Sequence, residues 1–450
     1  MCMTFMVNLP DSLKGKSVVV MGLGVFGGGA DTAKFAARFA KKVIVTDKGD
    51  EKKLAGSIKE LTSFKNIEFH LGEHRIEDFV NSDVIIVNPA VDENNPYIDA
   101  AKEKNRLITS QMEIFFQLCT ARIVAITGSN GKSTTTALTA HLLKNIKSGQ
   151  VFLSGNIGNR PLLETLELIK KDDIVVLEIS SFQLEQLGRI KKSPYVGCIT
   201  NIAPNHLDRH KTMENYCDAK ENILRFQNSG DVAVLNTHDE KCRQWYEKYK
   251  KTDRKCVLFD REKLDSKLTA AFKLPGKANR ENLAAAITIA HHFGMADEEL
   301  IESVASFVSL PHRLQLVGTV NGVRYYNDSI ATTPESTVVG VEAFGEPKIL
   351  IAGGYDKGLD FDKMARQISD KLKALILIGQ TADKIEQSIR KTGKIPPIYR
   401  SKSLTEAVSK AKEVSSPGDV VLLSPACASY DMFVNFVQRG EQFGELVNKL

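Results

Sequence analysis

Residues 123–136 read IVAITGSNGKSTTT: an apolar run passes directly into a loop with two glycines, and a lysine and a row of hydroxyl side chains follow. An apolar run that ends in a glycine loop is typical of a buried strand, and the residues after the loop favour a helix. Gly128 and Gly131 allow a compact turn whose backbone N–H groups can face phosphate oxygens. The stretch therefore predicts a strand, a phosphate-binding loop and a helix in succession.

The spacing of this loop differs from that of the standard phosphate loop. The pattern G-x-x-x-x-G-K-[ST] places a glycine five residues before Gly131, where this chain has Ile126. Lys132 can nevertheless neutralise the β- and γ-phosphates of a nucleotide, and Ser133 or Thr134 can hold Mg²⁺. The alternative is a glycine-rich helix start with a surface lysine. The strand before, the helix after and the flanking Gly and Ser argue against that alternative.

The same pattern of strand, loop and helix starts three times along the chain. Apolar runs predict strands at 17–24, 42–47, 83–91, 122–127, 174–180, 196–202, 231–236, 348–354, 374–379 and 419–426. Strands that alternate with helices predict parallel sheets with right-handed crossovers. We therefore expect an α/β fold with three domains in series, covering residues 1–110, 111–309 and 310–450.

Two segments of the middle third have a different character. Residues 279–294 have strong helix character and end at a glycine, as a helix C-terminus often does. Residues 237–273 are polar, lysine-rich and weakly periodic. We interpret them as surface connections with short strands.

The composition is that of a globular chain of 450 residues, with 42% hydrophobic and 26% charged residues. The net charge of +5 is spread along the chain, so it argues little for nucleic acid. Seven cysteines without a C-x-x-C pair favour reduced thiols in a cytoplasm. We see no signal-peptide pattern at the N-terminus and no apolar run that could span a bilayer. We expect a cytoplasmic protein with neither a nucleic-acid partner nor a membrane span.

A second glycine motif, GLGVFG at 22–27, follows the first strand and fits G-x-G-x-x-G. Asp47 closes the next strand, as an acid does in dinucleotide-binding units, where the glycines let a pyrophosphate approach a helix N-terminus. A nicotinamide or flavin site, and hence a dehydrogenase, is one interpretation. A tight turn that merely needs glycines, or a loop for another diphosphate, is the alternative.

Polar residues mark the ends of the central strands. Glu178 lies inside an apolar strand, where a carboxylate is either a Mg²⁺ ligand or part of a buried salt bridge, because burying an isolated charge is costly. His206 and Asp208 crowd the loop after the strand at 196–202, and α/β sheets collect active sites at such carboxyl ends. Lys220, on the next expected helix, reads as a plain solvated lysine when it is taken alone.

The last third carries four polar stretches at expected strand ends or domain junctions: LPHRLQ, YNDSIATTPES, AGGYDKGLDF and SPACASYDMFVNFVQRGEQF. Arg313 can stabilise a transferring phosphate, and Lys357 can bind a carboxylate. An ordinary turn is the alternative for the stretch around Lys357.

Together these stretches resemble the Mur ligase family, the ATP-dependent enzymes that build the peptide of bacterial cell-wall precursors. The resemblance rests on TGSNGKSTTT, LEISSFQLE, TNIAPNHLDRH, YCDAK, NRENLAAA, LPHRLQ and YNDSIATT, which occur in the family's order. The family's ATP loop has the shortened form G-[ST]-N-G-K-[ST], so the absence of a glycine at 126 is expected. LEISSFQLE and LLSPACASYDMFVNFVQRGEQF look most like the member that adds D-glutamate.

The resemblance implies a Rossmann-like first domain for the UDP of UDP-N-acetylmuramoyl-L-alanine, a P-loop ATPase-like central domain for ATP, and a Rossmann-like last domain for D-glutamate. It also implies that ATP phosphorylates a substrate carboxylate with the help of Mg²⁺, and that the amine of D-glutamate attacks the acyl phosphate. We expect a monomer. The alternatives are a sister Mur ligase or a folylpolyglutamate-type ligase with another amino acid, a nicotinamide oxidoreductase, and a non-catalytic nucleotide switch.

The resemblance also assigns roles to individual residues. The residues expected to bind ATP are Gly128, Asn130, Gly131, Lys132, Ser133, Thr134, Asn279, Asn282, Arg313 and Asp328. Those expected to contact the UDP-linked substrate are Gly22, Gly24, Val25, Phe26, Asp47, Asn88 and Asn156, and those for D-glutamate are Thr332, Lys357, Ser429 and Phe436. The expected catalytic residues are Lys132, Glu178, His206 and a carbamylated Lys220, and the expected metal ligands are Ser133, Thr134, Glu178, His206 and Lys220.

Three positions depart from the family pattern. Ile330 stands where the family usually has a lysine, so a positive group near the reacting phosphates or the glutamate is missing. Phe26 replaces a small polar residue in the UDP loop, and NPA at 88–90 replaces a serine-proline-glycine.

Overall fold

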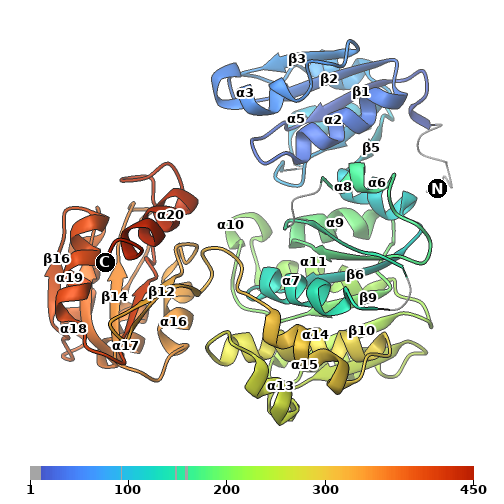
Figure 1. The fold of residues 1–450 in the computed structure, drawn as a ribbon. Helices are drawn as coiled ribbons and strands as arrows, with labels where there is room; N and C mark the ends of the chain where they lie inside the picture. Colours follow the sequence, from blue (N-terminus) through green and yellow to red (C-terminus); the bar gives the residue numbers. More distant parts are fainter. Residues whose placement is uncertain (1–11, 93, 147–148, 158–160) are drawn as a thin grey trace. The chain divides into compact units, whose positions relative to one another are not determined.

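Each of the three expected α/β segments forms a sheet of its own in the computed structural model of the chain (Figure 1). The structure describes residues 12–92, 94–146, 149–157 and 161–450. The chain divides into two compact units: the first runs to Lys263 and includes Leu283–Ala296, and the second consists of Leu264–Asn282 and Asp297–Leu450. The first unit contains the N-terminal and central sheets, and the second contains the C-terminal sheet.

The N-terminal sheet is parallel throughout, with the strand order β3-β2-β1-β4-β5. Its strands are β1 (Ser17–Met21), β2 (Lys42–Asp47), β3 (Ile67–Leu71), β4 (Val84–Val87) and β5 (Leu107–Thr109). Its helices are α2 (Gly28–Phe39), α3 (Glu51–Lys59), α4 (Ile76–Asn81) and α5 (Pro96–Glu103), and α6 (Gln111–Leu118) follows. Val18 and Val20 face one buried cluster while Val19 and Met21 face another, so both sides of the sheet are covered.

The central sheet is also parallel, with the order β11-β10-β9-β6-β8-β7. Its strands are β6 (Arg122–Thr127), β7 (Val151–Gly155), β8 (Ile174–Glu178), β9 (Val196–Ile199), β10 (Val232–Asn236) and β11 (Lys255–Phe259). Its helices are α7 (Lys132–Leu143), α8 (Leu162–Thr165), α9 (Ser181–Arg189), α10 (Leu207–His210), α11 (Met213–Arg225) and α12 (Glu240–Tyr249). Helices α13 (Ser266–Ala271), α14 (Lys277–His292) and α15 (Asp297–Ser306) follow.

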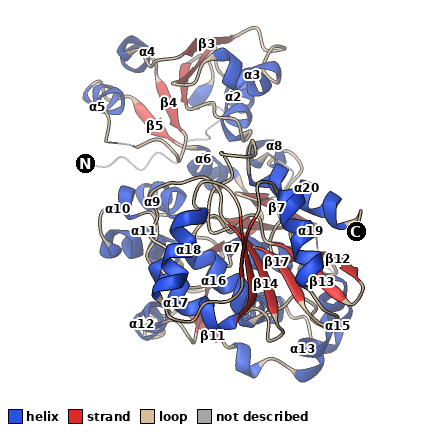
Figure 2. Cartoon of the chain, turned by 90° about the vertical axis from the view of Figure 1, so that its left-hand side faces the viewer, coloured by secondary structure: helices blue, strands red, loops and turns tan. Residues whose placement is uncertain are grey.

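The C-terminal sheet has the order β12-β13-β17-β14-β15-β16. Its strands are β12 (Gln315–Val320), β13 (Val323–Asn327), β14 (Lys348–Ala352), β15 (Leu372–Leu377), β16 (Ile398–Arg400) and β17 (Val420–Leu423). Its helices are α16 (Pro334–Glu342), α17 (Asp362–Ile368), α18 (Ala382–Lys391), α19 (Leu404–Val414) and α20 (Phe436–Val447). Helices α16, α17 and α18 pack on one face, and α19 and α20 on the other (Figure 2).

Every strand predicted from an apolar run is present. Strands β5, β7, β13 and β16 were not predicted, and three further features of the fold differ from the prediction. The polar stretch after β2 contains β3, whose residues are mostly half-exposed and therefore carry no continuous apolar run. Residues 237–273 contain helices α12 and α13 besides the strand β11. The helical signal was present, because Cys242, Trp245 and Tyr249 are the buried face of α12.

The third difference is at the edge of the C-terminal sheet, which is not wholly parallel. Strand β12 pairs with β13 in the antiparallel direction. The hairpin turns through Asn321 and Gly322, both with positive φ, which is the sequence preference of a tight hairpin turn.

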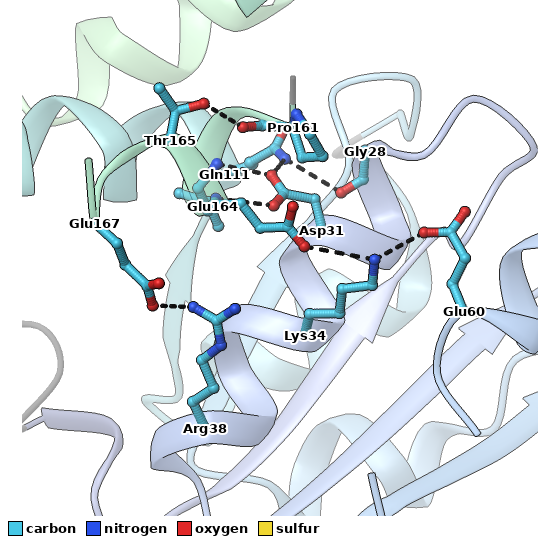
Figure 3. A network of polar contacts seen from close by, with 11 residues as sticks. Gly28, Asp31, Lys34, Arg38, Glu60, Gln111, Pro161, Glu164, Thr165 and Glu167 are labelled. Carbon is cyan, nitrogen blue, oxygen red and sulfur yellow. Dashed lines mark hydrogen bonds and ion pairs between the residues drawn. The ribbon is translucent and has the colours of Figure 1, made fainter. Parts of the chain in front are cut away.

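Asp31 ties helix α2 to the segment that precedes and forms α8 (Figure 3). Asp31 is 2% exposed, and its carboxylate accepts the backbone N–H groups of Leu163 and Glu164, at 2.8 and 3.1 Å. Gln111 donates to the same carboxylate at 2.6 Å and to the carbonyl of Gly28 at 3.2 Å. Because α2 starts directly after the GLGVFG loop, these bonds fix the helix that carries the loop.

Partly exposed ion pairs lie beside this buried carboxylate. Lys34 pairs with Glu60 at 2.8 Å and with Glu164 at 3.5 Å, and Arg38 pairs with Glu167 (Figure 3). Exposed pairs contribute little to stability, because water screens the charges and the long side chains lose freedom. The buried carboxylate of Asp31 therefore contributes most of the stability of this contact between α2 and α8.

We expect Asp31→Ala to lower the free energy of unfolding by about 1–3 kcal/mol, because two buried N–H groups lose their acceptor. Lys34→Ala, on the same helix, is the matched control and should cost less than about 1 kcal/mol. Urea unfolding followed by circular dichroism measures both variants. Equal losses in the two would contradict the role assigned to Asp31.

Candidate active site

The turn between β6 and α7 has a geometry that only glycine tolerates at two positions. Strand β6 ends at Thr127, and α7 begins at Lys132. Gly128 has a φ of +149°, and a Cβ at this position would lie 1.9 Å from Thr200 Oγ1. Gly131 caps α7 in the left-handed conformation, with a φ of 81°. Both glycines are therefore required by the backbone and its neighbours.

The position that lacks the glycine of a standard phosphate loop lies in the sheet. Ile126 is a fully buried residue of β6, where it pairs with Glu178 of β8 and Cys198 of β9. A glycine here would sit in the core of the sheet rather than in the loop. The short form of the loop thus follows from where the strand ends.

Residues after β9 hold the phosphate loop in one shape. Thr200 Oγ1 donates to the carbonyl of Asn130 at 2.6 Å. The side chain of Asn201 bonds both the N–H and the carbonyl of Asn130, at 2.9 and 3.0 Å. Ser129 donates its backbone N–H to the carbonyl of Asn201 at 2.9 Å, and its hydroxyl donates to the carbonyl of Ala203 at 2.8 Å. The loop is therefore bonded along its length to the neighbouring strand end.

The first turn of α7 places a cation and two hydroxyls at this loop. Lys132 Nζ donates to the carbonyls of Gly128 and Ser129, at 3.0 and 2.9 Å. Ser133 and Thr134 are buried in the same turn. A lysine above a glycine loop at a helix N-terminus is an arrangement that binds phosphate groups.

Two buried polar side chains lie beside the loop. Glu178, the last residue of β8, is 6% exposed, and its Oε2 atom is buried without a hydrogen-bond partner. Lys220, on α11, is 2% exposed and donates to Thr127 Oγ1 at 3.1 Å and to the carbonyl of Gly128 at 3.0 Å. Burial, and then the charge of Lys132, hold the pKa of Lys220 well below its usual range. The interpretation of Lys220 as a solvated lysine is therefore wrong.

The donors around the loop fit a magnesium ion rather than a softer metal. Within the described residues, no group of three or more His, Cys, Asp or Glu side chains is placed to hold a metal. The buried, unpaired oxygen of Glu178 and the hydroxyls of Ser133 and Thr134 are oxygen donors, which Mg²⁺ prefers. An unsatisfied buried carboxylate oxygen is costly unless a cation or a donor reaches it.

His206 stands at the start of α10 in a strained conformation. Its φ is 53°, in the left-handed region that few residues with side chains adopt. Its ring centroid is 5.1 Å from that of Phe182. Partial burial and the charges of Lys132 and Lys220 lower the pKa of His206, which favours the neutral imidazole. A neutral imidazole can accept a hydrogen bond or ligate a metal.

The GLGVFG motif forms a tight loop that neighbouring strands close. The N–H of Gly24 donates to Asp47 Oδ2 at 2.9 Å. Asn88 donates to the carbonyl of Gly22 at 3.4 Å, and Ser57 donates to the carbonyl of Gly24 at 2.7 Å. The structure thus brings Gly22, Gly24, Asp47 and Asn88 together at the carboxyl ends of β1, β2 and β4.

The other residues expected near the UDP-linked substrate lie outside this cluster. Val25 and Phe26 form the tip of the loop, and the side chain of Phe26 is 99% exposed. Asn156 follows β7, and its N–H donates to the carbonyl of Glu178 at 3.1 Å. Asn156 therefore lies next to the carboxyl end of β8.

Predicted residues of the second unit follow adjacent strands of the C-terminal sheet. Asp328 follows β13, Ser429 comes after β17, and Lys357 comes after β14. These strands are neighbours in the order β13-β17-β14, so their carboxyl ends share one edge. Phe436 begins α20, and its carbonyl accepts the hydroxyl of Ser329 at 2.8 Å.

Three further predicted residues of this unit have hydrogen bonds to residues nearby in the sequence. Asn282 donates to the side chain of Asn279 at 3.2 Å, one turn away on α14. The N–H of Thr332 donates to the carbonyl of Ile330 at 2.8 Å.

The carboxyl group of Asp328 is enclosed by the protein. It accepts Ser424 Oγ at 2.8 Å and the N–H of Leu314 at 3.2 Å. Burial raises the pKa of Asp328 to about 7, against the opposing effects of these bonds and of the charge on Arg313. Asp328 is therefore partly protonated at neutral pH.

Comparisons with known proteins agree along the chain. A model of the Mur ligase MurD-like N-terminal domain matches residues 16–110, one of the Mur ligase middle domain matches 126–290, and one of the Mur ligase glutamate ligase domain matches 312–427. A relative from Acetivibrio thermocellus named UDP-N-acetylmuramoylalanine--D-glutamate ligase is 40% identical, over 97% of each chain. The chain belongs to the Mur ligase family.

Other Mur ligases extend this result. A relative of the same name from Clostridium novyi is 38% identical over 98% of each chain. The solved structure of UDP-N-acetylmuramate-alanine ligase MurC from Thermotoga maritima has a TM-score of 0.59 at 21% identity, covering 96% of this chain and 99% of that one. MurF ligase from the same organism, solved in complex with ADP, has a TM-score of 0.57 at 19% identity, covering 100% and 99%. The structural likeness confirms the predicted fold of three α/β domains.

Several residues that shape this Mur ligase site were not predicted. Thr200 and Asn201 hold the loop, and the hydroxyl of Tyr216 lies 3.0 Å from Ser129 Oγ. Two polar residues directly after a buried strand were a usable signal for the first pair. Tyr216, on α11, belongs to the YCDAK stretch of the resemblance, but an aromatic residue on a helix is usually a core residue and was not given a role.

Stability should depend on pH through Asp328. Its pKa in the folded state, about 7, lies above the ordinary value of 3.8, so its contribution is fully present below pH ~3.8 and is lost as the pH rises through 7. Asp328→Asn keeps the shape of the protonated acid, since its amide can donate to Ser424 and its carbonyl can accept from Leu314. We expect the wild-type protein to lose up to about 1.4 kcal/mol per pH unit relative to this variant between pH 4 and 7. Parallel pH profiles of the two unfolding free energies would contradict this expectation.

Proposed function

We propose that this chain forms an amide bond between D-glutamate and UDP-N-acetylmuramoyl-L-alanine at the expense of ATP, in the synthesis of peptidoglycan precursors. Relatives of that name that align over nearly the whole chain support the proposal. The observation that carries it is the pair of buried groups beside the phosphate loop, the Glu178 carboxylate with its unpaired Oε2 atom and the Lys220 amine.

The chemistry follows from the poor reactivity of a carboxylate. The γ-phosphoryl group of ATP moves to the carboxylate oxygen of the L-alanine residue, which yields ADP and an acyl phosphate. The amine of D-glutamate, having lost a proton, attacks the carbonyl carbon. The tetrahedral intermediate then collapses with loss of inorganic phosphate, and the amide remains. Positioning and charge neutralisation supply most of the catalysis in such transfers.

In this proposal each segment of the chain has its own ligand. Residues 1–110 receive the UDP-linked substrate, 111–309 bind ATP, and 310–450 receive D-glutamate. The clusters at the carboxyl ends of the three sheets support this division, because α/β sheets bind ligands at those ends. Four residues of the second unit are also assigned to ATP: Asn279, Asn282, Arg313 and Asp328.

Residues around the phosphate loop would neutralise the transferring group. Lys132 binds the phosphates of ATP, and Ser133, Thr134, Glu178, His206 and a carbamylated Lys220 are the proposed ligands of Mg²⁺. When bound, Mg²⁺ offsets the negative charge that develops on the phosphoryl oxygens. An uncharged lysine amine can add to carbon dioxide, and the lowered pKa of Lys220 supports that modification.

The proposed enzyme is a cytoplasmic monomer. Among the described residues no helix is both long and apolar enough to cross a membrane. The six cysteines of the described chain are free, and burial raises the pKa of several of them, Cys119 among them. These features suit a reducing compartment, where the nucleotide substrates are also found.

The decisive assay supplies ATP, Mg²⁺ and UDP-N-acetylmuramoyl-L-alanine with one amino acid at a time, and measures phosphate release. D-glutamate should be the amino acid that supports turnover. Turnover with L-alanine or another acceptor instead would assign the chain to a sister ligase. Tight NADH binding without ATP turnover in folded protein would defeat the ligase proposal altogether.

Removal of the Lys220 side chain tests the carbamate. We expect Lys220→Ala to lower kcat by about 100-fold or more, or about 2.7 kcal/mol, because a metal ligand is lost. Added formate or acetate should restore part of the activity by replacing the carboxylate group. Lys220→Arg, which keeps a positive charge but cannot be carbamylated, should stay inactive. The exposed Lys192→Ala variant is the control for general effects of losing a lysine. Full activity of Lys220→Ala would refute this role.

A further inference from the structure

The C-terminal sheet contains an arginine that is buried without an ion pair. Arg439, on α20, is 1% exposed and is among the largest fully buried side chains of the described chain. No carboxylate of the described residues lies within 4.0 Å of its guanidinium. Asp431 is the carboxylate whose charge acts on Arg439 without contact. Burial lowers the pKa of Arg439 to about 10, so it remains charged at neutral pH.

Every hydrogen-bond acceptor of this guanidinium is neutral. Nε donates to Ser329 Oγ at 2.9 Å, and Nη2 donates to the carbonyl of Ser329 at 2.8 Å. Nη2 also donates to the carbonyl of Cys427 at 3.1 Å, and Nη1 donates to that of Ala428 at 3.3 Å. The side chain thus joins the segment after β13 to the segment after β17, and its positive charge is left without a counter-charge in contact.

The same bonds extend to the other segments assigned to D-glutamate. The hydroxyl of Ser329 donates to the carbonyl of Phe436 at 2.8 Å, and the N–H of Tyr355 donates to the carbonyl of Ala428 at 2.9 Å. Tyr355 lies two residues before Lys357. The segments that carry Thr332, Ser429, Phe436 and Lys357 are therefore all linked, directly or through one shared acceptor, to Arg439.

Stability alone does not account for a buried, unpaired cation. A buried charge costs several kcal/mol, and an apolar side chain of similar size at such a site is often neutral or stabilising. A fixed guanidinium that holds several backbone carbonyls is, however, well suited to order loops around an anionic ligand. D-glutamate is a dicarboxylate, so positive potential behind its binding loops favours it.

We infer that Arg439 is a positioning residue for the amino-acid substrate: it holds the four segments in register and supplies positive charge behind them. The inference rests on the proposed function, which assigns those segments to D-glutamate. It also addresses the departure at Ile330, since Arg439 bonds to the carbonyl of Ser329, the residue directly before it. The positive charge of the lysine that the family usually has at position 330 is thereby replaced by the buried charge of Arg439.

Steady-state kinetics of three variants tests the inference. Arg439→Met removes both charge and hydrogen bonds, and we expect the KM for D-glutamate to rise about 100-fold, as for a substrate displaced by about 1 Å. The KM values for ATP and for the UDP-linked substrate should change by less than about threefold. Arg439→Lys keeps the charge, so its KM for D-glutamate should be about tenfold lower than that of Arg439→Met.

Lys348→Met is the matched control. Lys348 is the other strongly buried cation of this sheet, and its ammonium also bonds only to backbone carbonyls, those of Phe344 and Glu346. It lies at the first residue of β14, at the end of the sheet opposite to the glutamate segments. We expect this variant to leave the KM for D-glutamate unchanged.

The outcomes separate the inference from the proposed function. A wild-type protein without D-glutamate turnover would defeat the proposed function, and the inference with it. An active wild type whose Arg439→Met variant has an unchanged KM for D-glutamate, or equal rises for all three substrates, would overturn the inference alone. An equal rise in Lys348→Met would do the same. If Arg439→Met does not fold, Arg439→Lys tests the inference. An unaltered KM for D-glutamate and an unaltered melting temperature in this variant would show that the hydrogen bonds of the guanidinium are dispensable, and would overturn the inference.

Discussion

The pairing of β6 with β8 on one side and β9 on the other determines where this chain can carry out chemistry. Because the three strands are parallel, the residues that follow them emerge at the same edge of the central sheet. This brings Gly128, Glu178 and Thr200 to one place from distant parts of the sequence. A slip of one residue in either pairing would turn Glu178 or its partners to the opposite face. The phosphate loop, its supports and the buried carboxylate all depend on this register.

Much of the fold could be predicted, because parallel sheets bury both faces and their strands then read as continuous apolar runs. Strand β3 was missed because it is an edge strand whose residues are mostly half-exposed. Helix α12 was missed although its buried residues have helical spacing, because polar and charged residues separate them. The antiparallel strand β12 carries glycine and threonine in place of an apolar run. These failures share a cause, which is that a partly covered element shows only half of its pattern.

The site could be predicted where the residue type is itself informative, as with Lys132 next to a glycine loop or Glu178 in an apolar strand. Lys220 is the opposite case. The sequence around a lysine on a polar helix is the same whether its ammonium group lies in solvent or against the end of a strand. Thr200, Asn201 and Arg439 contact residues that are distant in the sequence. A local sequence pattern does not predict such contacts. The roles assigned to these residues in binding ATP, magnesium and glutamate remain predictions, whereas their placement is an observation.

The short phosphate loop has a consequence for how such a chain can change. Position 126 belongs to a buried strand. Position 128 cannot have a side chain, because its φ is positive and a Cβ would clash with the Thr200 hydroxyl. Replacing Ile126 by glycine would open a hole in the sheet and add no length to the loop. The short loop and the standard one are therefore separated by an insertion, not by a series of point substitutions.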